Sequence, residues 1–171
     1  NSDVLFVDDC SGRGSFRGSV EQYWMPVFRA VLAHPNDSVD VYDVNGPTSG
    51  VSNGPGSRAK TQQLVDAYNK IVWDSGDLRT ITISDGTVNS DKSNDCDMLI
   101  SWFETSLHVC GLWVCGDGIA YNLNALATTP ALTLMSTWCG VDYVATSYFN
   151  ETGGRTGGGT VTPLITGNPA A

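Results

Sequence analysis

Four short apolar runs, each ending in acidic residues or in a cysteine and glycines, constrain most strongly what this chain can fold into. They read VLFVDD (residues 4–9), VDVYDV (39–44), KIVWDSGD (70–77) and GLWVCGDG (111–118). Between them lie stretches with apolar residues at helical spacing, over residues 19–34, 59–68 and 94–107. Strands that alternate with helices form a parallel sheet covered on both faces. The sequence therefore predicts a three-layer α/β domain with a mostly parallel sheet of at least four strands, in the order 3-2-1-4 or a near variant.

The other segments add weaker predictions. Residues 45–57 are rich in Gly, Pro and Ser and are expected to form a surface loop. A helix is predicted over residues 129–140, with Gly140 at its C-terminal cap, and a strand over residues 141–149. All tryptophans lie in apolar segments, so we expect them in the core and not on a sugar-binding surface: Trp24, Trp73, Trp102, Trp113 and Trp138.

Length and charge limit the classes of function. The 171 residues suit a single domain, either complete or part of a longer secreted protein. A net charge of -9 disfavours nucleic acid and anionic lipid as partners, and no apolar run approaches the roughly 20 residues of a membrane span. Few lysines, many small polar residues and the acidic balance are typical of secreted bacterial domains. We therefore expect a secreted, periplasmic or cell-surface protein.

The cysteines do not indicate a zinc site. No pair has the C-x2-C spacing, and both histidines, His34 and His108, stand alone. In an oxidising compartment the odd number permits two disulfides and one free thiol, whereas in a reducing one all would be small buried apolar residues. The sequence leaves this choice open for Cys10, Cys96, Cys110, Cys115 and Cys139.

Polar residues follow the strands and are expected at one rim of the sheet, where ligands of doubly wound sheets bind. In the structural interpretation these acids cap loops and helices. In the functional one they converge around Ca²⁺ or Mg²⁺. We expect no metal and no cofactor, because Asp8 and Asp9 should point apart and Asp117 can cap the following helix. The predicted rim comprises Asp8, Asp9, Asp74, Asp77, Gly116 and Asp117, with Cys10, Asp43, Ser75 and Cys115 beside it.

Two families share parts of this pattern. Paired acids after the first strand and another after the third resemble the phosphoacceptor pocket of response-regulator receivers, but no lysine follows Lys92, as a receiver would require. The order of VLFVDD, a helix, VDVYDV, LVDAYNKIVWDSGD, a helix containing LISWF and GLWVCGDGIA resembles the class I glutamine amidotransferase-like fold over residues 3–127. More narrowly, it is similar to degenerate domains of this type in large secreted bacterial proteins. The resemblance implies a flavodoxin-like sheet.

The resemblance also implies how an active member would work. A nucleophilic cysteine would lie between glycines on the turn from strand to helix, with a histidine and an acid later in the chain. Here Gly116 falls at the nucleophile position, Cys115 lies one residue earlier, and both histidines precede Cys115. We therefore expect a non-catalytic accessory or ligand-binding domain, with other domains of a parent protein or a small ligand as partner. The alternative is a hydrolase, either a cysteine-dependent amidase or a metal-assisted enzyme, for which Cys115 and Asp117 are the catalytic candidates.

Overall fold

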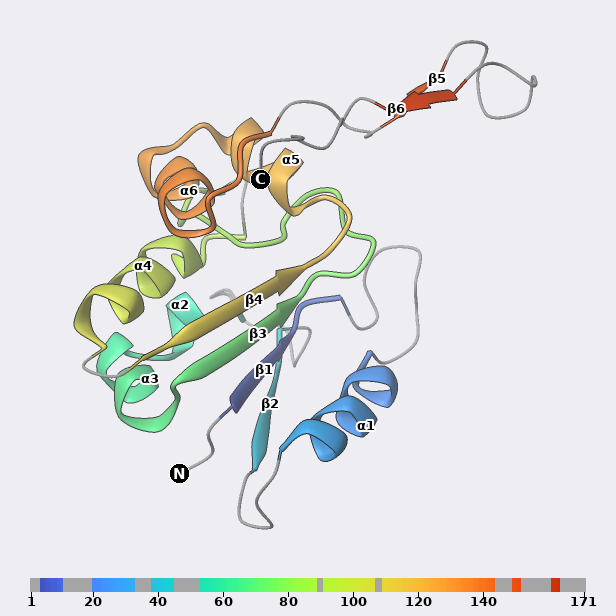
Figure 1. The fold of residues 1–171 in the computed structure, drawn as a ribbon. Coiled ribbons are helices and arrows are strands. Elements are labelled where there is room, and N and C mark those ends of the chain that lie inside the picture. The colour runs from blue at the N-terminus through green and yellow to red at the C-terminus, as the bar shows by residue number, and fades with distance from the viewer. Residues whose placement is uncertain are drawn as a thin grey trace.

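The computed structural model describes residues 4–10, 20–32, 38–44, 53–88, 91–106 and 109–143, with the backbone of two short strands further along (Figure 1). No helix among the described residues is long and apolar enough to cross a membrane.

A parallel sheet forms the centre of the described chain. Its strands are β1 (Val4–Asp8), β2 (Val39–Asp43), β3 (Lys70–Asp74) and β4 (Gly111–Cys115). All neighbours are parallel, and the order is β2-β1-β3-β4. The parallel α/β sheet is thus confirmed.

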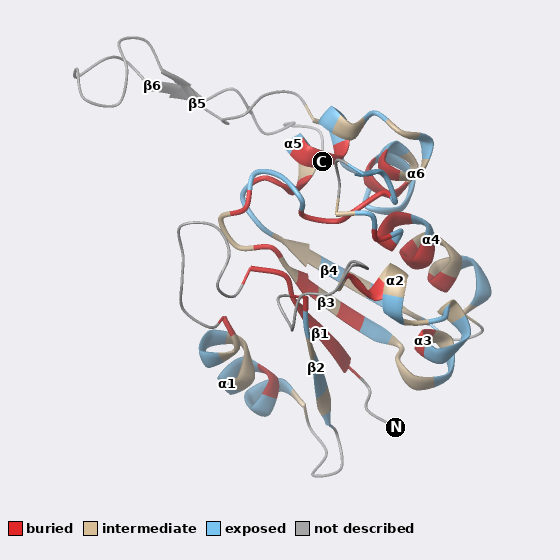
Figure 2. Cartoon of the chain, turned by 180° about the vertical axis from the view of Figure 1, so that it is seen from behind, coloured by how far each residue is buried: buried red, intermediate tan, exposed pale blue. Residues whose placement is uncertain are grey.

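The prediction was the order 3-2-1-4 or a near variant, and the observed order differs from 3-2-1-4 in that β3 lies beside β1 and not outside β2. The composition of the strands gives the physical reason. β1 is buried along its whole length and β3 at alternate positions, whereas β2 carries exposed acids at Asp40 and Asp43 (Figure 2). The buried strands β1 and β3 therefore take the centre, and the acidic strand β2 takes an edge where its carboxylates reach water.

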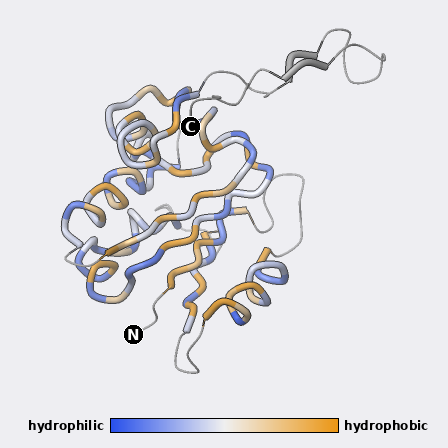
Figure 3. The backbone as a smooth tube through the Cα atoms, in the orientation of Figure 1, coloured by the Kyte–Doolittle hydropathy of each residue, from blue (hydrophilic) through white to orange (hydrophobic). Residues whose placement is uncertain are grey.

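Alternate residues of β1 face two separate hydrophobic clusters. Val4 and Phe6 pack with Phe28 and Trp24 of α1 (Glu21–Val31). Leu5 and Val7 belong to the other cluster, and Figure 1 shows α1 on the side of the sheet away from α3 and α4. Residues of β1 therefore belong to a different hydrophobic cluster on each face of the strand, and apolar residues run along the central strands in Figure 3.

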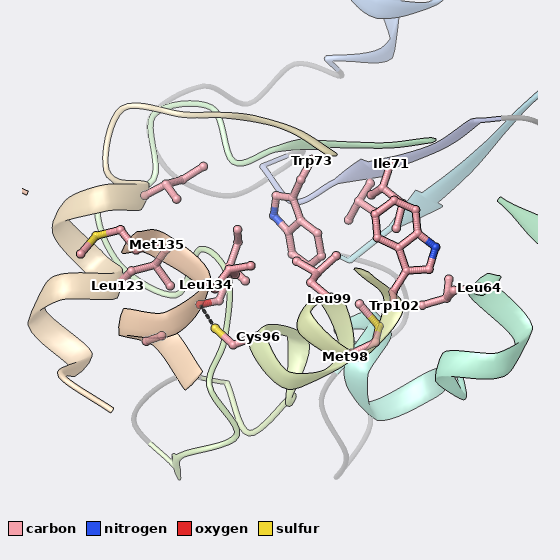
Figure 4. Packing of buried hydrophobic residues seen from close by; sticks show 14 of the residues in the cluster. Leu64, Ile71, Trp73, Cys96, Met98, Leu99, Trp102, Leu123, Leu134 and Met135 are labelled. Atoms are coloured by element: carbon pink, nitrogen blue, oxygen red, sulfur yellow. Dashed lines mark hydrogen bonds between the residues drawn. The ribbon is translucent and has the colours of Figure 1, made fainter. Parts of the chain in front are cut away.

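The larger cluster is built by the helices that follow β2, β3 and β4. These are α2 (Pro55–Arg58), α3 (Thr61–Ala67), α4 (Asp95–Thr105), α5 (Ile119–Leu126), α6 (Thr129–Leu132) and the π-helix η2 (Thr133–Trp138). Figure 4 shows Trp73 and Ile71 of β3 meeting Leu99 and Trp102 of α4. Burial of the apolar face of α4 confirms the helical period read from residues 94–107.

Several predictions need correction. The predicted loop over residues 45–57 contains the start of α2, and its residues 45–52 lie outside the described residues. Of the predicted strand over residues 141–149, Val141–Tyr143 are not in a strand and 144–148 lie outside the described residues. Its last residue begins β5 (Phe149–Glu151), which pairs antiparallel with β6 (Val161–Pro163). Gly140 has the left-handed φ of +64° expected of a cap, although the helical turn before it is a π-helix.

Two tryptophans depart from the predicted core. Trp73 and Trp102 are fully buried, but Trp113 is 64% exposed and Trp138 is 36% exposed. Trp113 lies on β4, which is an edge strand in the described sheet, so one side of it has no neighbouring strand to cover it. The apolar pattern of the strand therefore did not predict the exposure of Trp113.

Candidate functional site

The turn between β4 and α5 has the glycine geometry of an elbow. Gly116 has a φ of +148°, a backbone conformation that side chains disfavour. Gly118 occupies the N-cap position of α5, and a Cβ there would collide with the backbone of Leu78. No side chain caps this helix, so the capping role expected for Asp117 is wrong. Asp117 is exposed, and its N–H donates to the carbonyl oxygen of Gly76 (2.8 Å).

Cys115 points away from this turn and into the sheet. Its Sγ donates to the carbonyl oxygen of Trp73 across 3.4 Å, and the carboxylate of Asp74 lies beside it. Burial, and after it the negative charge of Asp74, raises the pKa of the Cys115 thiol to about 12. A thiol with this pKa stays protonated at neutral pH, and only the thiolate is nucleophilic.

A second cysteine lies at the centre of the acidic rim. Cys10 is fully buried, and burial, together with the charges of Asp8, Asp74, Asp9 and Asp77, raises its pKa to about 12. The structure therefore gathers four of the predicted rim acids around one neutral thiol. The sequence predicted Cys10 at this rim, directly after the acids of the first strand, but not that it lies among four of them.

The paired acids Asp8 and Asp9 point to different partners, as their strand geometry predicts. Asp8 Oδ1 accepts the N–H of Cys10 (3.1 Å), and Asp8 also contacts Glu21, whose pKa is raised by burial and by this neighbour. Asp9 Oδ2 accepts the hydroxyl of Ser75 (2.7 Å). The two carboxylates therefore serve different loops and do not form a pair.

Asp74 is bound by neutral donors. Its Oδ2 accepts the indole N–H of Trp24 (2.6 Å), and its Oδ1 accepts the backbone N–H of Gly76 (2.8 Å). This contact joins α1 to the end of β3. Among the described residues, no three His, Cys, Asp or Glu side chains are arranged to hold a metal ion. The rim acids thus organise the loops around them, while Gly116 and Asp117 lie exposed on the β4–α5 turn.

The distance from the elbow to a catalytic base stays untested. His34 and His108 both lie outside the described residues. The expectation that the elbow lacks a catalytic base therefore remains a prediction.

An apolar pocket adjoins the elbow on the side of α5. It has a volume of about 470 Å³, and Trp138 of η2 stacks on Phe103 of α4 in its wall, with ring centres 4.8 Å apart and planes 6° from parallel. No lining residue is charged. The lining consists of Ile83, Phe103, Leu112, Trp113, Val114, Gly116, Ile119, Ala120, Leu123, Met135, Trp138, Cys139 and Val141. Sequence reasoning missed this pocket because its wall comes from four elements whose packing no local pattern reveals.

A buried carboxylate at the start of α4 was also missed. Asp95 is 2% exposed and accepts three hydrogen bonds, from the N–H of Gly56 (2.7 Å), the hydroxyl of Ser93 (2.6 Å) and the N–H of Ser84 (3.4 Å). Burial raises its pKa to about 6, although these donors act in the opposite direction. Asp95 therefore ties α2 and the loop before α4 to the helix. In the sequence it is one of several polar residues near a helix start.

Comparison of the chain with protein-family models, with curated proteins and with solved structures finds no match in any of the three.

Proposed function

We propose that this chain is a non-catalytic, amidotransferase-like domain that serves as an accessory or ligand-binding module of a secreted bacterial protein. The proposal has a three-layer, flavodoxin-like arrangement as its fold. The strand order β2-β1-β3-β4 supports it, because flavodoxin-like sheets have the order 2-1-3-4-5. The hydrophobic clusters on both faces of β1 support the three layers.

The environment of Cys115 carries the non-catalytic part of the proposal. Its thiol donates to a main-chain carbonyl inside the sheet and lies beside Asp74, with a pKa of about 12. At pH 7 roughly one such thiol in a hundred thousand is ionised. Cysteine nucleophiles instead need positive neighbours or a helix N-terminus that stabilise the thiolate. The residue at the elbow itself is Gly116, which has no side chain to react.

The apolar pocket supports a binding role. Its volume of about 470 Å³ falls within the range of small-molecule sites, and the side chains that line it are uncharged and mostly apolar or aromatic. An uncharged, mostly apolar ligand fits this lining, because a charged group would lose its hydration without gaining a partner. The pocket touches the turn where active amidotransferases would bind substrate, so the same region of the fold would serve binding without chemistry.

Alkylation kinetics test the non-catalytic assignment. The folded chain is treated with iodoacetamide at neutral pH, and modification of each cysteine is followed by peptide mass spectrometry, with free cysteine as the reference thiol. We expect Cys115 to react at least about tenfold more slowly than the reference, because very little of its thiol is ionised and its side chain is half-buried. The half-buried Cys110 serves as the internal comparison, and the chain in urea as the control for intrinsic reactivity.

The opposite result has a clear meaning. If Cys115 in the folded chain reacted faster than free cysteine while Cys110 did not, its thiolate would be stabilised. The cysteine-dependent hydrolase would then replace the accessory domain as the better proposal.

A further inference from the structure

A row of three aromatic side chains leads from the core of the described chain to the pocket. Trp102 of α4 is fully buried, and its indole N–H donates to the carbonyl oxygen of Tyr68 (3.2 Å). Phe103 lies tilted against Trp102, with ring centres 5.0 Å apart, and Trp138 of η2 stacks on Phe103. Phe103 and Trp138 line the pocket, whereas Trp102 is not among the lining residues. The row is therefore anchored in the core at one end and reaches the pocket at the other.

Trp138 ends this row with part of its indole uncovered. Phe103 covers one face of the indole, because the planes of the two rings are only 6° from parallel. Trp138 is nevertheless 36% exposed, so its exposed area belongs to the other face and to the edges. A flat ring in the pocket can stack on that face as Phe103 does on the covered one.

The π-helix holds Trp138 in this position. The N–H of Cys139 donates to the carbonyl oxygen of Leu134 (2.9 Å), which closes the wide turn that contains Trp138. Leu134 is fully buried in the larger cluster, so this turn is fixed to the core. A ring that is already held in place loses little conformational freedom when a ligand binds to it. π-Helices are rare and occur frequently at functional sites.

We propose that the pocket selects planar, uncharged aromatic ligands, which stack on the free face of Trp138. The inference rests on the proposed binding function and narrows its class of ligand. Stacked aromatic rings attract each other beyond the effect of burying their area, whereas a saturated ring gains only from that burial. A charged ligand would lose its hydration to a lining that carries no charge.

The stacking surface comes from helices and not from the edge of the sheet. Phe103 belongs to α4 and Trp138 to η2, and these two helices are in contact. Leu112 and Val114 of β4 form another part of the lining. Stacking on Trp138 therefore needs no group beyond the outer edge of β4.

Equilibrium dialysis tests the preference for flat rings. 2-Naphthol is compared with decahydro-2-naphthol, which has the same carbon skeleton and hydroxyl group but no aromatic face. We expect 2-naphthol to bind the folded chain at least about fivefold more tightly, a difference within the range that one stacked pair of rings supplies. Trp138→Leu should remove this preference, mainly by weakening the binding of 2-naphthol, and Trp138→Phe should retain it because a flat ring remains.

Trp113→Leu is the matched control. Trp113 is also among the lining residues, but its ring lies on the α1 side of the sheet, where it meets Trp24 edge-on at 6.5 Å. This variant should keep the preference for 2-naphthol. Circular dichroism checks that the variants fold. In the wild type, the indole N–H signal of Trp138 in NMR spectra, identified by its loss in Trp138→Phe, should shift on addition of 2-naphthol through the ring current of the stacked ligand.

The contrary outcomes are distinguishable. Equal binding of the two ligands by the wild type overturns the stacking inference and leaves the apolar pocket of the proposed function in place. A preference that survives Trp138→Leu or disappears in Trp113→Leu overturns the inference as well, and so does an unshifted Trp138 signal. Binding of neither ligand overturns both the inference and the binding role proposed for the pocket.

Discussion

Asp95 shows at the residue scale how a buried charge can organise a fold and still oppose its stability. Its carboxylate holds Gly56 and Ser84 by their N–H groups and Ser93 by its hydroxyl. A Cβ at Gly54 would overlap Ser93, so the chain before α2 passes this turn closely. The pKa of Asp95 in the folded chain is about 6, above its ordinary value of 3.8, because the cost of burying the charge exceeds the gain from the donors.

This raised pKa predicts a pH dependence of stability. The folded state binds the Asp95 proton more tightly than the unfolded state, so the free energy of unfolding falls as the pH rises from about 4 to about 6 and then levels off. The contribution amounts to about 3 kcal/mol. Urea titrations between pH 4 and pH 7.5 should show this loss in the wild type and a flatter profile in Asp95→Asn.

Asp97→Asn is the control, because Asp97 lies two residues further along α4 and is exposed. Its profile should follow the wild type. Parallel profiles for wild type and Asp95→Asn would show that Asp95 does not carry the raised pKa.

At the scale of elements, the sequence predicted the existence of the strands better than their neighbours. The apolar runs closed by acids correctly placed β1 to β4, because a buried strand and its polar end are both local features. The order of the strands depends on which of them is apolar enough for the centre, a comparison between distant segments. The π-helix was missed for a similar reason: its benefit, the stacking of Trp138 on Phe103, is tertiary.

The candidate site shows the same division. The displaced position of Cys115 could be read from the spacing of the glycines around it, whereas its partner atoms could not. The sequence alone does not show that Cys10 lies at the centre of the acidic rim. Asp74 and Asp77 come from β3 and the loop after it, and they lie near Cys10 because β3 is a neighbour of β1. The number of residues between two strands does not show whether these strands are neighbours in the sheet.

The elbow between β4 and α5 gives a prediction at this scale. Gly118→Ala should destabilise the fold by about 1–3 kcal/mol, because the added Cβ meets the backbone of Leu78, which cannot move aside like a flexible side chain. Gly111→Ala, at the start of the same strand, is the control, since a Cβ there has nothing within 4 Å. Thermal and urea unfolding of both variants measure the difference, and equal stabilities would contradict the close approach of the elbow to Leu78.

At the scale of the whole molecule, the two faces of the sheet are unequally built. Among the described residues, α1 contributes to the smaller hydrophobic cluster, and α3 to η2 contribute to the larger one. The pocket lies on the side of the larger cluster and beside β4, where α4, α5 and η2 meet the edge of the sheet. The described chain therefore has an uncharged pocket beside the uncharged strand β4, while the rim acids lie at the carboxyl ends of the strands and Asp40 and Asp43 lie on β2.

The uncharged lining of the pocket predicts which class of ligand it binds. A neutral apolar probe such as N-phenylnaphthylamine should bind with a dissociation constant on the order of 10 µM and brighten on binding, because the lining removes it from water without requiring a polar partner. Ala120→Trp should abolish the brightening, since Ala120 lines the pocket from α5 and an indole would fill part of its roughly 470 Å³. Ala30→Trp, on the exposed side of α1, is the matched control and should bind the probe like the wild type. Equal binding by both variants would place the probe elsewhere on the chain, and the apolar-ligand assignment of this pocket would then be wrong even if Cys115 proved unreactive.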